Sequence, residues 1–435
     1  MKKGFAAAVV VYLMFSAFFP VLSNSSVMES NLNPSKGGWL EERDGVRILH
    51  LNGSYYDMGY AHGFILRNEC LEDLRGFIDF AESYGYSYSD FLGLWDTVKD
   101  YIPAEYIEEM QGVADGANVS FEQVAVGNIM AMWVHCSGFS AWGSATSDGR
   151  LYQMRSLDFP VDIRDPLTGR FLQENSVLIV REPFGGLASL DPSFAGFVGS
   201  LGGLNEKGIA VEVLSSWSND EQWNGIPMMF RQRMVLDHAS TINEALGILT
   251  SNRTCGWNFI VSDGKIPVGY AVETTANHFY VGTWNNSVES TPPFWMLNHV
   301  VRRTNIFVAP ETASTQRSYY NPRFSLIHGK NILGWSKIPA FIPWRHYKAL
   351  SKGIEDKVGS INLNKSIIIA RDLYQGKTDF IFSLMVKMRM YTTLHQWAAC
   401  PETGEMLISF ATADKQAHEN PVYDFNLFEL VSEKP

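Results

Sequence analysis

The feature that most constrains the fold is a change of pattern near Cys136. Residues 55–135 carry helix signals, whereas most of the chain after them alternates short apolar runs with turn signals. Three of the turns are typical of hairpins: Ser147-Asp148-Gly149, Asn205-Glu206-Lys207-Gly208 and Pro401-Glu402-Thr403-Gly404. Hairpins join antiparallel strands, and flanking helices bury their apolar faces by covering the sheet. The pattern therefore predicts an α+β fold of antiparallel sheets covered by helices.

Two capping-box patterns mark where helices begin. Ser120, followed by Gln123, predicts a helix that runs to about Met132. Thr241 and Glu244 form the same pattern within a second helical stretch, residues 226–250. Four small residues ahead of the first box favour close packing between helices: Gly112, Ala114, Gly116 and Ala117.

Composition and motifs exclude several classes of protein. At 435 residues and 46% hydrophobic content, the chain is long enough for a packed core in one large domain or two to three smaller ones. Its formal net charge of −11 argues against nucleic acid as the main partner, because phosphate binding requires a cationic surface. The sequence contains no CxxC, GxGxxG, P-loop or HExxH motif. We therefore expect neither a metal nor a cofactor.

The first 23 residues have the three-part layout of a secretory signal peptide. Lys2 and Lys3 form the positive end, an apolar run covers residues 4–19, and small residues precede a cut after Ser23. The alternative is an uncleaved membrane anchor, because the run is near the lower length limit for a span. With the signal removed, we expect no stable membrane span and a secreted, lysosomal or periplasmic location. Residues 31–45 are polar and turn-rich, so we expect a linker there.

Two further features fit an exported chain. Besides Asn24, five asparagines stand in Asn-x-Ser/Thr sequons, which predicts N-glycosylation at Asn52, Asn118, Asn252, Asn285 and Asn364. If Cys136 is a working thiol, the other three cysteines are candidates for one disulfide with one left over: Cys70, Cys255 and Cys400.

The residues around Cys136 carry a resemblance to a known family. Cys136, Asp148-Gly149, Arg155 and Asp158 follow one another in an order and spacing that resemble the start of the catalytic chain in N-terminal nucleophile hydrolases. The chain is most similar to the penicillin acyltransferase-like family (acyl-CoA:6-aminopenicillanic acid acyltransferase), with choloylglycine hydrolase and acid ceramidase as relatives. The resemblance covers roughly residues 40–430. Its further marks are Gly59–Gly63, Glu109–Gly116, Asn258–Gly264 with Glu273, Asn298-His299 and Ser318–Arg323.

The resemblance implies a four-layer αββα sandwich of two antiparallel sheets. It also implies a precursor that cuts itself between His135 and Cys136, when the thiol attacks the preceding carbonyl group and the resulting ester is hydrolysed. The parts would be a signal peptide (1–23), a small helix-rich pro-segment (24–135) and a catalytic chain (136–435), the last two staying associated. His135 departs from the family, in which Gly is more usual before the nucleophile.

The cut would give Cys136 a free α-amino group, whose unperturbed pKa is about 8. This amine can take the thiol proton near neutral pH, so the nucleophile carries its own base. The resemblance makes Asp158 the partner of the amine, and Arg155 the group that stabilises the thiolate or binds substrate. The alternative for these two residues is an ordinary surface ion pair. Positions 155 and 158 face opposite sides of a regular strand, so both reach one site only if the strand ends or bulges there.

The remaining candidate site residues come from later segments. Asn258 is the candidate oxyanion donor, or else a structural residue at the start of a strand. Arg323 is the candidate for binding the substrate or its carboxylate. Tyr320 is expected to line the pocket, although Tyr is often only a half-buried wall. Other arginines fit the role of Arg323 as well: Arg302, Arg303 and Arg317.

The residues and the resemblance together predict an autoproteolytically activated amidase or acyltransferase. It would act on the linear amide bond of a small N-acyl substrate through an acyl-thioester on Cys136, with water or an amine as acceptor. Three alternatives stay open. They are a lipid-amide or peptide hydrolase of the same fold, a secreted glycoprotein that only binds ligands, and an uncut cysteine hydrolase with His62 or His299 as its base.

Overall fold

The computed structural model describes residues 36–129, 135–317 and 338–432, which all fall in one compact unit. Their strands form two sheets. In spatial order, the nine-stranded sheet contains β1 (Gly38–Arg43), β2 (Val46–Gly53), β5 (Ser176–Pro183), β6 (Ser189–Phe194), β7 (Gly202–Asn205), β8 (Ile209–Ser215), β9 (Trp257–Asp263), β10 (Val268–Thr274) and β11 (Phe279–Gly282). The six-stranded sheet contains β12 (Val300–Arg303), β3 (His135–Gly143), β4 (Gly149–Asp158), β13 (Thr393–Cys400), β14 (Glu405–Phe410) and β15 (Tyr423–Asn426).

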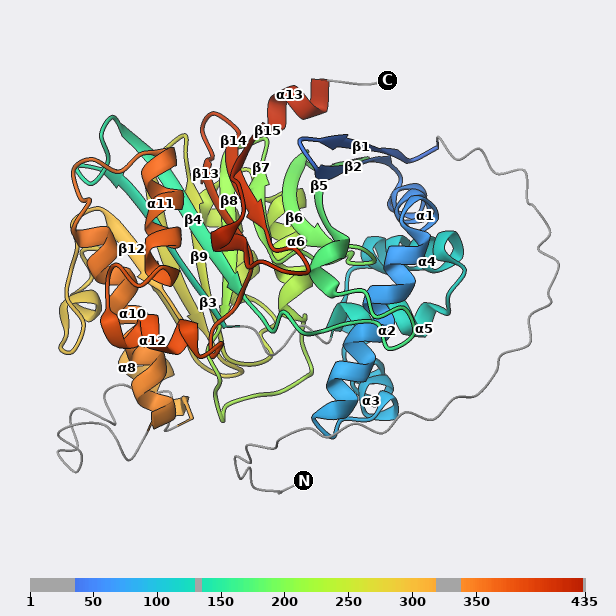
Figure 1. Cartoon of the computed structure of the whole chain (residues 1–435), viewed down its shortest axis with the longest axis horizontal. Helices are drawn as coiled ribbons and strands as arrows, with labels where there is room; N and C mark the ends of the chain where they lie inside the picture. Colours follow the sequence, from blue (N-terminus) through green and yellow to red (C-terminus); the bar gives the residue numbers. More distant parts are fainter. Residues whose placement is uncertain (1–35, 130–134, 318–337, 433–435) are drawn as a thin grey trace. The chain divides into compact units, whose positions relative to one another are not determined.

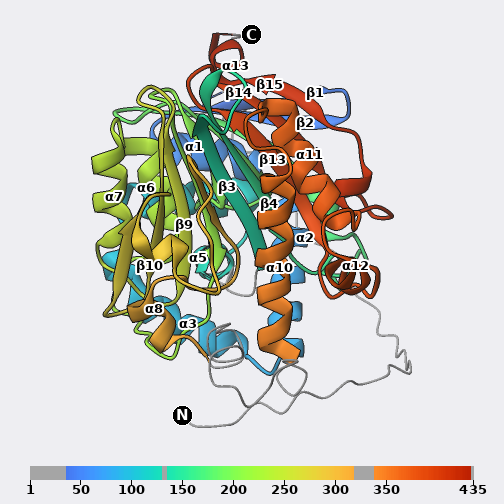
Figure 2. The same ribbon diagram turned by 90° about the vertical axis from the view of Figure 1, so that its left-hand side faces the viewer.

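Helices cover the outer face of each sheet (Figures 1 and 2). On the side of the nine-stranded sheet lie α1 (Tyr55–Ile65), α2 (Arg67–Ser83), α3 (Tyr88–Val98), α4 (Ala104–Ala117), α5 (Phe121–Ile129), α6 (Met228–His238) and α7 (Ile242–Thr250). On the six-stranded sheet lie α10 (Ile338–Glu355), α11 (Leu363–Tyr374) and α12 (Phe380–Lys387). The short helices α8 (Pro310–Thr315) and α13 (Leu427–Ser432) complete the described set.

The two sheets pack face to face around a buried apolar cluster. Leu157 from the six-stranded sheet and Val213 and Phe259 from the nine-stranded sheet belong to this cluster. The opposite face of the six-stranded sheet, for example Met154, packs against Leu373 of α11. The expected four-layer αββα order and the three expected hairpins, β3–β4, β7–β8 and β13–β14, are therefore confirmed.

One pair of strands departs from the expected antiparallel sheets. β2 and β5 are parallel, with Ile48 opposite Leu178 and Leu51 opposite Arg181. Parallel neighbours need a long crossover connection, and here the chain between them includes α1 to α5 and the β3–β4 hairpin of the other sheet. A turn signal cannot reveal such a pair, because it marks only strands that follow each other directly.

The structure corrects two local predictions. Residues 38–43, expected in a polar linker, form the edge strand β1, whose Trp39 ring stacks on His50 at a centroid distance of 4.3 Å. An edge strand with one face toward water contains many polar residues, so its sequence resembles a linker. The helical stretch 226–250 is two helices, because Thr241 caps the second one. Its side-chain hydroxyl oxygen accepts a hydrogen bond from the backbone N–H of Glu244. The helix predicted from Ser120 is α5, which the structure describes as far as Ile129.

Glycines bring α1 and α4 into backbone contact. A Cβ atom at Gly112 would lie 2.3 Å from the carbonyl oxygen of Tyr56, and one at Gly59 would lie 2.0 Å from that of Glu109. Both distances are too short for a real contact, so the close helix packing expected from the small residues is confirmed.

This contact predicts a large effect of adding a single methyl group. Gly112→Ala should lower the free energy of unfolding by about 3 kcal/mol, because the helices must move apart. Gly93→Ala is the matched control, since Gly93 lies inside α3 with no atom within 4 Å of the added Cβ. It should raise stability by about 0.5–1 kcal/mol through helix propensity. Urea unfolding of both variants checks the prediction, and equal effects would contradict it.

The expected sites of disulfide bonding and glycosylation can be placed in the fold. All four cysteines are buried and unpaired, so the expected disulfide among Cys70, Cys255 and Cys400 is absent from this structure. Four sequon asparagines are exposed: Asn118, Asn252, Asn285 and Asn364. The fifth, Asn52 in β2, is half-buried. Asn24 and the expected signal peptide lie outside the described residues. Among the described helices, none is long and apolar enough to span a membrane.

Candidate active site

The β3–β4 hairpin places Cys136 beside Arg155 at the inner face of the six-stranded sheet. Gly149 ends the turn at a φ of +81°, a value that favours glycine. The register sets Cys136 opposite Leu157 and Gly138 opposite Arg155. One Arg155 nitrogen, Nη2, lies 3.5 Å from Cys136 Sγ and donates to the carbonyl oxygen of Val213 at 3.1 Å. Both side chains are fully buried, so their contact excludes a surface ion pair for Arg155.

The thiol environment combines burial with a cation. Burial raises the pKa of the Cys136 thiol to about 11, while Arg155 and a hydrogen bond from the backbone of Asp158 act in the opposite direction. The thiol is therefore protonated at neutral pH in this uncut chain, and it needs a nearby base before it can attack.

Asp158 lies at the end of β4, where it faces the helical layer rather than Arg155. Its carboxylate accepts hydrogen bonds from Ser156 Oγ, at 3.0 Å, and from the hydroxyl of Tyr374 in α11. His346 Nε2 is 3.9 Å away. Burial raises the pKa of the Asp158 carboxyl well above its ordinary value. Since Asp158 is paired with His135 in the sheet, it lies at the expected cleavage junction although Arg155 points the other way.

Asn305 is a site residue that the sequence reasoning missed. It follows β12, and its Oδ1 accepts a hydrogen bond from the backbone N–H of Cys136 at 3.2 Å. Its Nδ2 donates to the carbonyl oxygen of Ser215 at 2.8 Å. The nitrogen that Asn305 holds is the one that cleavage would turn into the α-amino group. The only signal in the sequence is a polar residue next to an apolar run, Ile306–Ala309.

Asn258 and a buried ionic network hold the loop that carries Asn305. Asn258 Nδ2 donates to the carbonyl oxygens of Thr304 and Ile306, at 2.8 and 2.9 Å. Both hydrogens of its amide are thus engaged by the loop, and the oxyanion role expected for Asn258 stays a prediction.

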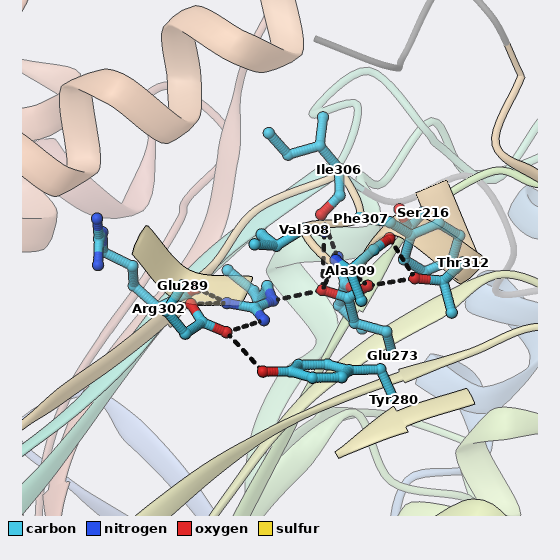
Figure 3. A network of polar contacts seen from close by, with 12 residues as sticks. Ser216, Glu273, Tyr280, Glu289, Arg302, Ile306, Phe307, Val308, Ala309 and Thr312 are labelled. Carbon is cyan, nitrogen blue, oxygen red and sulfur yellow. Dashed lines mark hydrogen bonds and ion pairs between the residues drawn. The ribbon is translucent and has the colours of Figure 1, made fainter. Parts of the chain in front are cut away.

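Figure 3 shows the ionic network, whose Glu273 lies directly opposite Asn258 in the β9–β10 pair. Glu273 accepts hydrogen bonds from the N–H groups of Val308 and Ala309, and it pairs with Arg303 at 2.9 Å. Arg303 also forms a bidentate ion pair with Glu289, in which its two Nη atoms donate to the two carboxylate oxygens. These groups are buried, and such a satisfied network fixes loop geometry.

The arginines expected at the substrate are distributed as follows. Arg323 and Tyr320 lie outside the described residues. Arg303 is committed to the network of Figure 3, and Arg302 donates to Ser351 and to the carbonyl oxygen of Trp295, each at 2.6 Å. Arg317 is half-buried, stacks over Trp217 and lies 4.0 Å from Glu221.

A second residue missed by the sequence reasoning is Glu212 of β8. Its fully buried carboxylate has no hydrogen-bond partner among the described residues, and a Cβ atom at Gly138 would lie 2.2 Å from one of its oxygens. Burial raises the pKa of the Glu212 carboxyl well above its ordinary value, and Arg155 acts against that rise. A lone Glu in the apolar strand Ile209–Ser215 was the available signal.

Glu212 predicts a pH-dependent stability difference. The folded state holds the proton of this carboxyl to a higher pH than the unfolded chain does. The stability linked to it is therefore present below the unfolded pKa, near 4.3, and is lost as the pH rises toward the folded pKa. In uncut Cys136→Ala protein, Glu212→Gln should be about as stable as its parent at low pH. Above a pH of about 4.3, the free energy of unfolding of Glu212→Gln should exceed that of its parent by a margin that grows by up to about 1.4 kcal/mol per pH unit. Thermal unfolding from pH 5 to 8 tests this, and a constant difference would contradict it.

The two histidines considered as alternative bases are engaged elsewhere. His62 Nε2 accepts the N–H of Gly196 at 2.9 Å, and burial lowers the pKa of His62 to about 3. His299 Nδ1 lies 2.7 Å from Ser144 Oγ. Neither contact involves the thiol.

Comparison with known proteins shows that part of the chain is similar to a known family. Residues 146–319 match the model of the family described as Acyl-coenzyme A:6-aminopenicillanic acid acyl-transferase. The expected resemblance is confirmed. The match begins ten residues after Cys136 and includes Arg155, Asp158, Asn258 and Asn305.

Two related proteins are similar to part of this chain. An uncharacterized protein of Archaeoglobus fulgidus is 27% identical over 368 residues, which are 74% of this chain and 57% of that protein. The protein dcd1B of Dictyostelium discoideum is 29% identical over 246 residues, 49% of this chain and 47% of that protein. The chain thus spans about half the length of these relatives.

Two solved structures are similar to this chain at low sequence identity. The N-acylethanolamine-hydrolyzing acid amidase ortholog of Caenorhabditis elegans is 14% identical, with a TM-score of 0.41, and covers 67% of this chain and 100% of its own. Penicillin V acylase from Agrobacterium tumefaciens is also 14% identical, with a TM-score of 0.42, and covers 68% of this chain and 87% of its own.

Proposed function

We propose that this chain is a self-cleaving N-terminal-cysteine amidase or acyltransferase that acts on linear amide bonds. One observation carries the proposal: Arg155 contacts the Cys136 sulfur while Asn305 accepts from the Cys136 nitrogen. The two atoms that the mechanism uses, a sulfur and the nitrogen next to it, thus both have polar partners in a buried site.

The first reaction is the cut itself. The Cys136 sulfur attacks the carbonyl carbon of His135, the carbon–nitrogen bond breaks, and the nitrogen of Cys136 gains the thiol proton. Water then hydrolyses the thioester to give a carboxylate at His135 and a free thiol on Cys136. The backbone of Asp158 is paired with His135 across the sheet, so we expect this pairing to hold the carbonyl group that is attacked.

Turnover uses the amine made by the cut. The amine takes the proton of the thiol, the thiolate attacks the substrate carbonyl, and the leaving amine departs with a proton while an acyl-thioester remains. Arg155 stabilises the thiolate, and Asn305 and Asp158 orient the amine. Asn258 takes the predicted oxyanion role if cleavage frees one of its two amide hydrogens. The cluster that contains Cys136 also holds Phe194, which favours an apolar acyl group.

The two fragments should stay associated after the cut. Glu109 in α4 pairs with Arg233 in α6 at 2.9 Å, and the hydroxyls of Tyr55 and Tyr106 donate to Asp237 in α6. The first fragment also supplies β1 and β2 of the nine-stranded sheet. We expect both fragments to elute together in size-exclusion chromatography without denaturant and to separate with it. The exported location and the sequon glycans belong to the same proposal.

A substrate panel tests this function. Purified protein is incubated with N-acyl amines and N-acyl amino acids of increasing acyl length, and the released amine is measured. We expect turnover of apolar acyl groups and, with a slow substrate, an acyl adduct on the fragment that begins with Cys136. Turnover by Cys136→Ala protein would contradict the proposal. Binding without turnover would instead favour a glycoprotein that only binds ligands. Cleavage of peptides or lipid amides alone would favour a peptide or lipid-amide hydrolase of the same fold.

A further inference from the structure

The outer side of α12 exposes a row of large apolar side chains. Phe380, Leu384 and Met388 are spaced four residues apart and are 82%, 50% and 65% exposed, and Met390 beyond them is 43% exposed. Residues at this spacing share one side of a helix. An exposed apolar patch of this kind marks an interaction site.

The inner side of the same helix fixes it firmly to the fold. Phe382 is fully buried, and its ring stacks on His346 of α10 at a centroid distance of 4.7 Å and an angle of 9°. Phe382 also packs against Tyr391. Figure 2 shows α12 next to α10 on the outside of the six-stranded sheet. The exposed row is therefore held outward by a well-packed inner face.

Positive charge surrounds the apolar row. Lys387 and Arg389 are exposed there, and within the described residues no acid lies within ion-pair distance of either. Lys377 is also exposed, and it pairs with Asp372 at 2.7 Å. The only acid in residues 375–391 is Asp379, which caps α12 and pairs with Arg345 at 3.3 Å. This segment thus has the opposite sign to the whole chain, whose formal net charge is −11.

We propose that this surface binds an anionic lipid bilayer at its interface. The α12 face consists of Lys377, Phe380, Leu384, Lys387, Met388, Arg389 and Met390. A helix with apolar side chains on one side and cations beside them inserts into the headgroup region of such a membrane. A second copy of the chain fits less well, because a two-fold contact would set Lys387 and Arg389 against the same cations. The proposal does not rest on the amidase function.

Vesicle flotation tests the proposal with the full chain. The vesicles contain phosphatidylcholine alone or phosphatidylcholine partly replaced by phosphatidylserine, each at low and high salt. We expect binding to the anionic vesicles that weakens with salt. The variant Phe380→Ser with Met388→Ser should reduce the partition coefficient at least about tenfold. Phe184→Ser is the matched control, since Phe184 is 75% exposed in the turn after β5, and it should bind as wild type does.

A second variant tests the charges without changing the apolar row. Lys387→Glu with Arg389→Glu should abolish the preference for anionic vesicles and its salt dependence. Thermal unfolding should be unchanged in every variant, because all the replaced side chains are exposed. The proposal is overturned if wild type does not bind anionic vesicles, or if Phe184→Ser loses as much binding as the α12 variants. It is also overturned if light scattering shows a wild-type dimer that the α12 variants lose.

Discussion

Cys136→Ala protein is expected to remain a single uncut chain with no amidase activity. The variant lacks the sulfur that attacks the carbonyl of His135, and no later step can replace it. Cys136→Ser should be cut slowly, because a hydroxyl is a weaker nucleophile than a thiolate. Denaturing gel electrophoresis of the three proteins over time measures the difference.

Cys400→Ala is the matched control for this experiment. Cys400 is also a buried, unpaired thiol in the six-stranded sheet, on β13. Its replacement should leave cleavage at the wild-type rate, because Cys400 belongs to a different apolar cluster from Cys136. Equal cleavage of Cys136→Ala and wild type would show that another group, or another protease, cuts the chain.

Asp158→Asn should lower kcat by about 100-fold or more while leaving the fold intact. In the proposed mechanism Asp158 orients the new amine, and removing a group that orients or exchanges a proton at a reacting centre typically has an effect of this size. Ser156 and Tyr374 donate to different oxygens of Asp158, and an Asn side chain keeps only one acceptor oxygen, so one of the two hydrogen bonds is retained. Thermal unfolding should therefore show a loss of about 1–2 kcal/mol at most, with the fold intact. The assay uses protein that is already cut, so that slow maturation is not counted as slow turnover.

Tyr374→Phe separates the charge of Asp158 from its placement. This variant keeps the carboxylate and removes the hydroxyl that holds it, so we expect a smaller loss of kcat and a shifted pH profile. Full activity of Asp158→Asn would refute the role assigned to that residue. A loss of activity that merely follows a loss of thermal stability would make the role structural.

The sequence predicted the layered fold because its strongest signals are local. Turn residues such as Asp148-Gly149 identify strands that follow each other, and capping boxes such as the one at Thr241 identify helix starts. The parallel contact between β2 and β5 was not predictable in this way, since it joins strands that are far apart in the chain. The edge strand β1 was missed because its polar face resembles a linker.

In the candidate site, too, the residues close together in the sequence were predictable and the distant ones were not. Cys136, Arg155 and Asp158 lie on one hairpin, and their spacing in the sequence made them recognisable. Asn305 and Glu212 reach the same place from distant strands through tertiary packing, and neither belongs to a short motif. Their buried polar groups became informative only when their neighbours were known.

The most direct test of the account is the N-terminus of the mature wild-type protein. Intact mass spectrometry with N-terminal sequencing of active protein should show a fragment that begins with Cys136. Its 300 residues correspond to about 34 kDa before any glycan, at roughly 112 Da per residue. A preparation that turns over amides although the backbone is continuous through residues 135 and 136 would contradict the account.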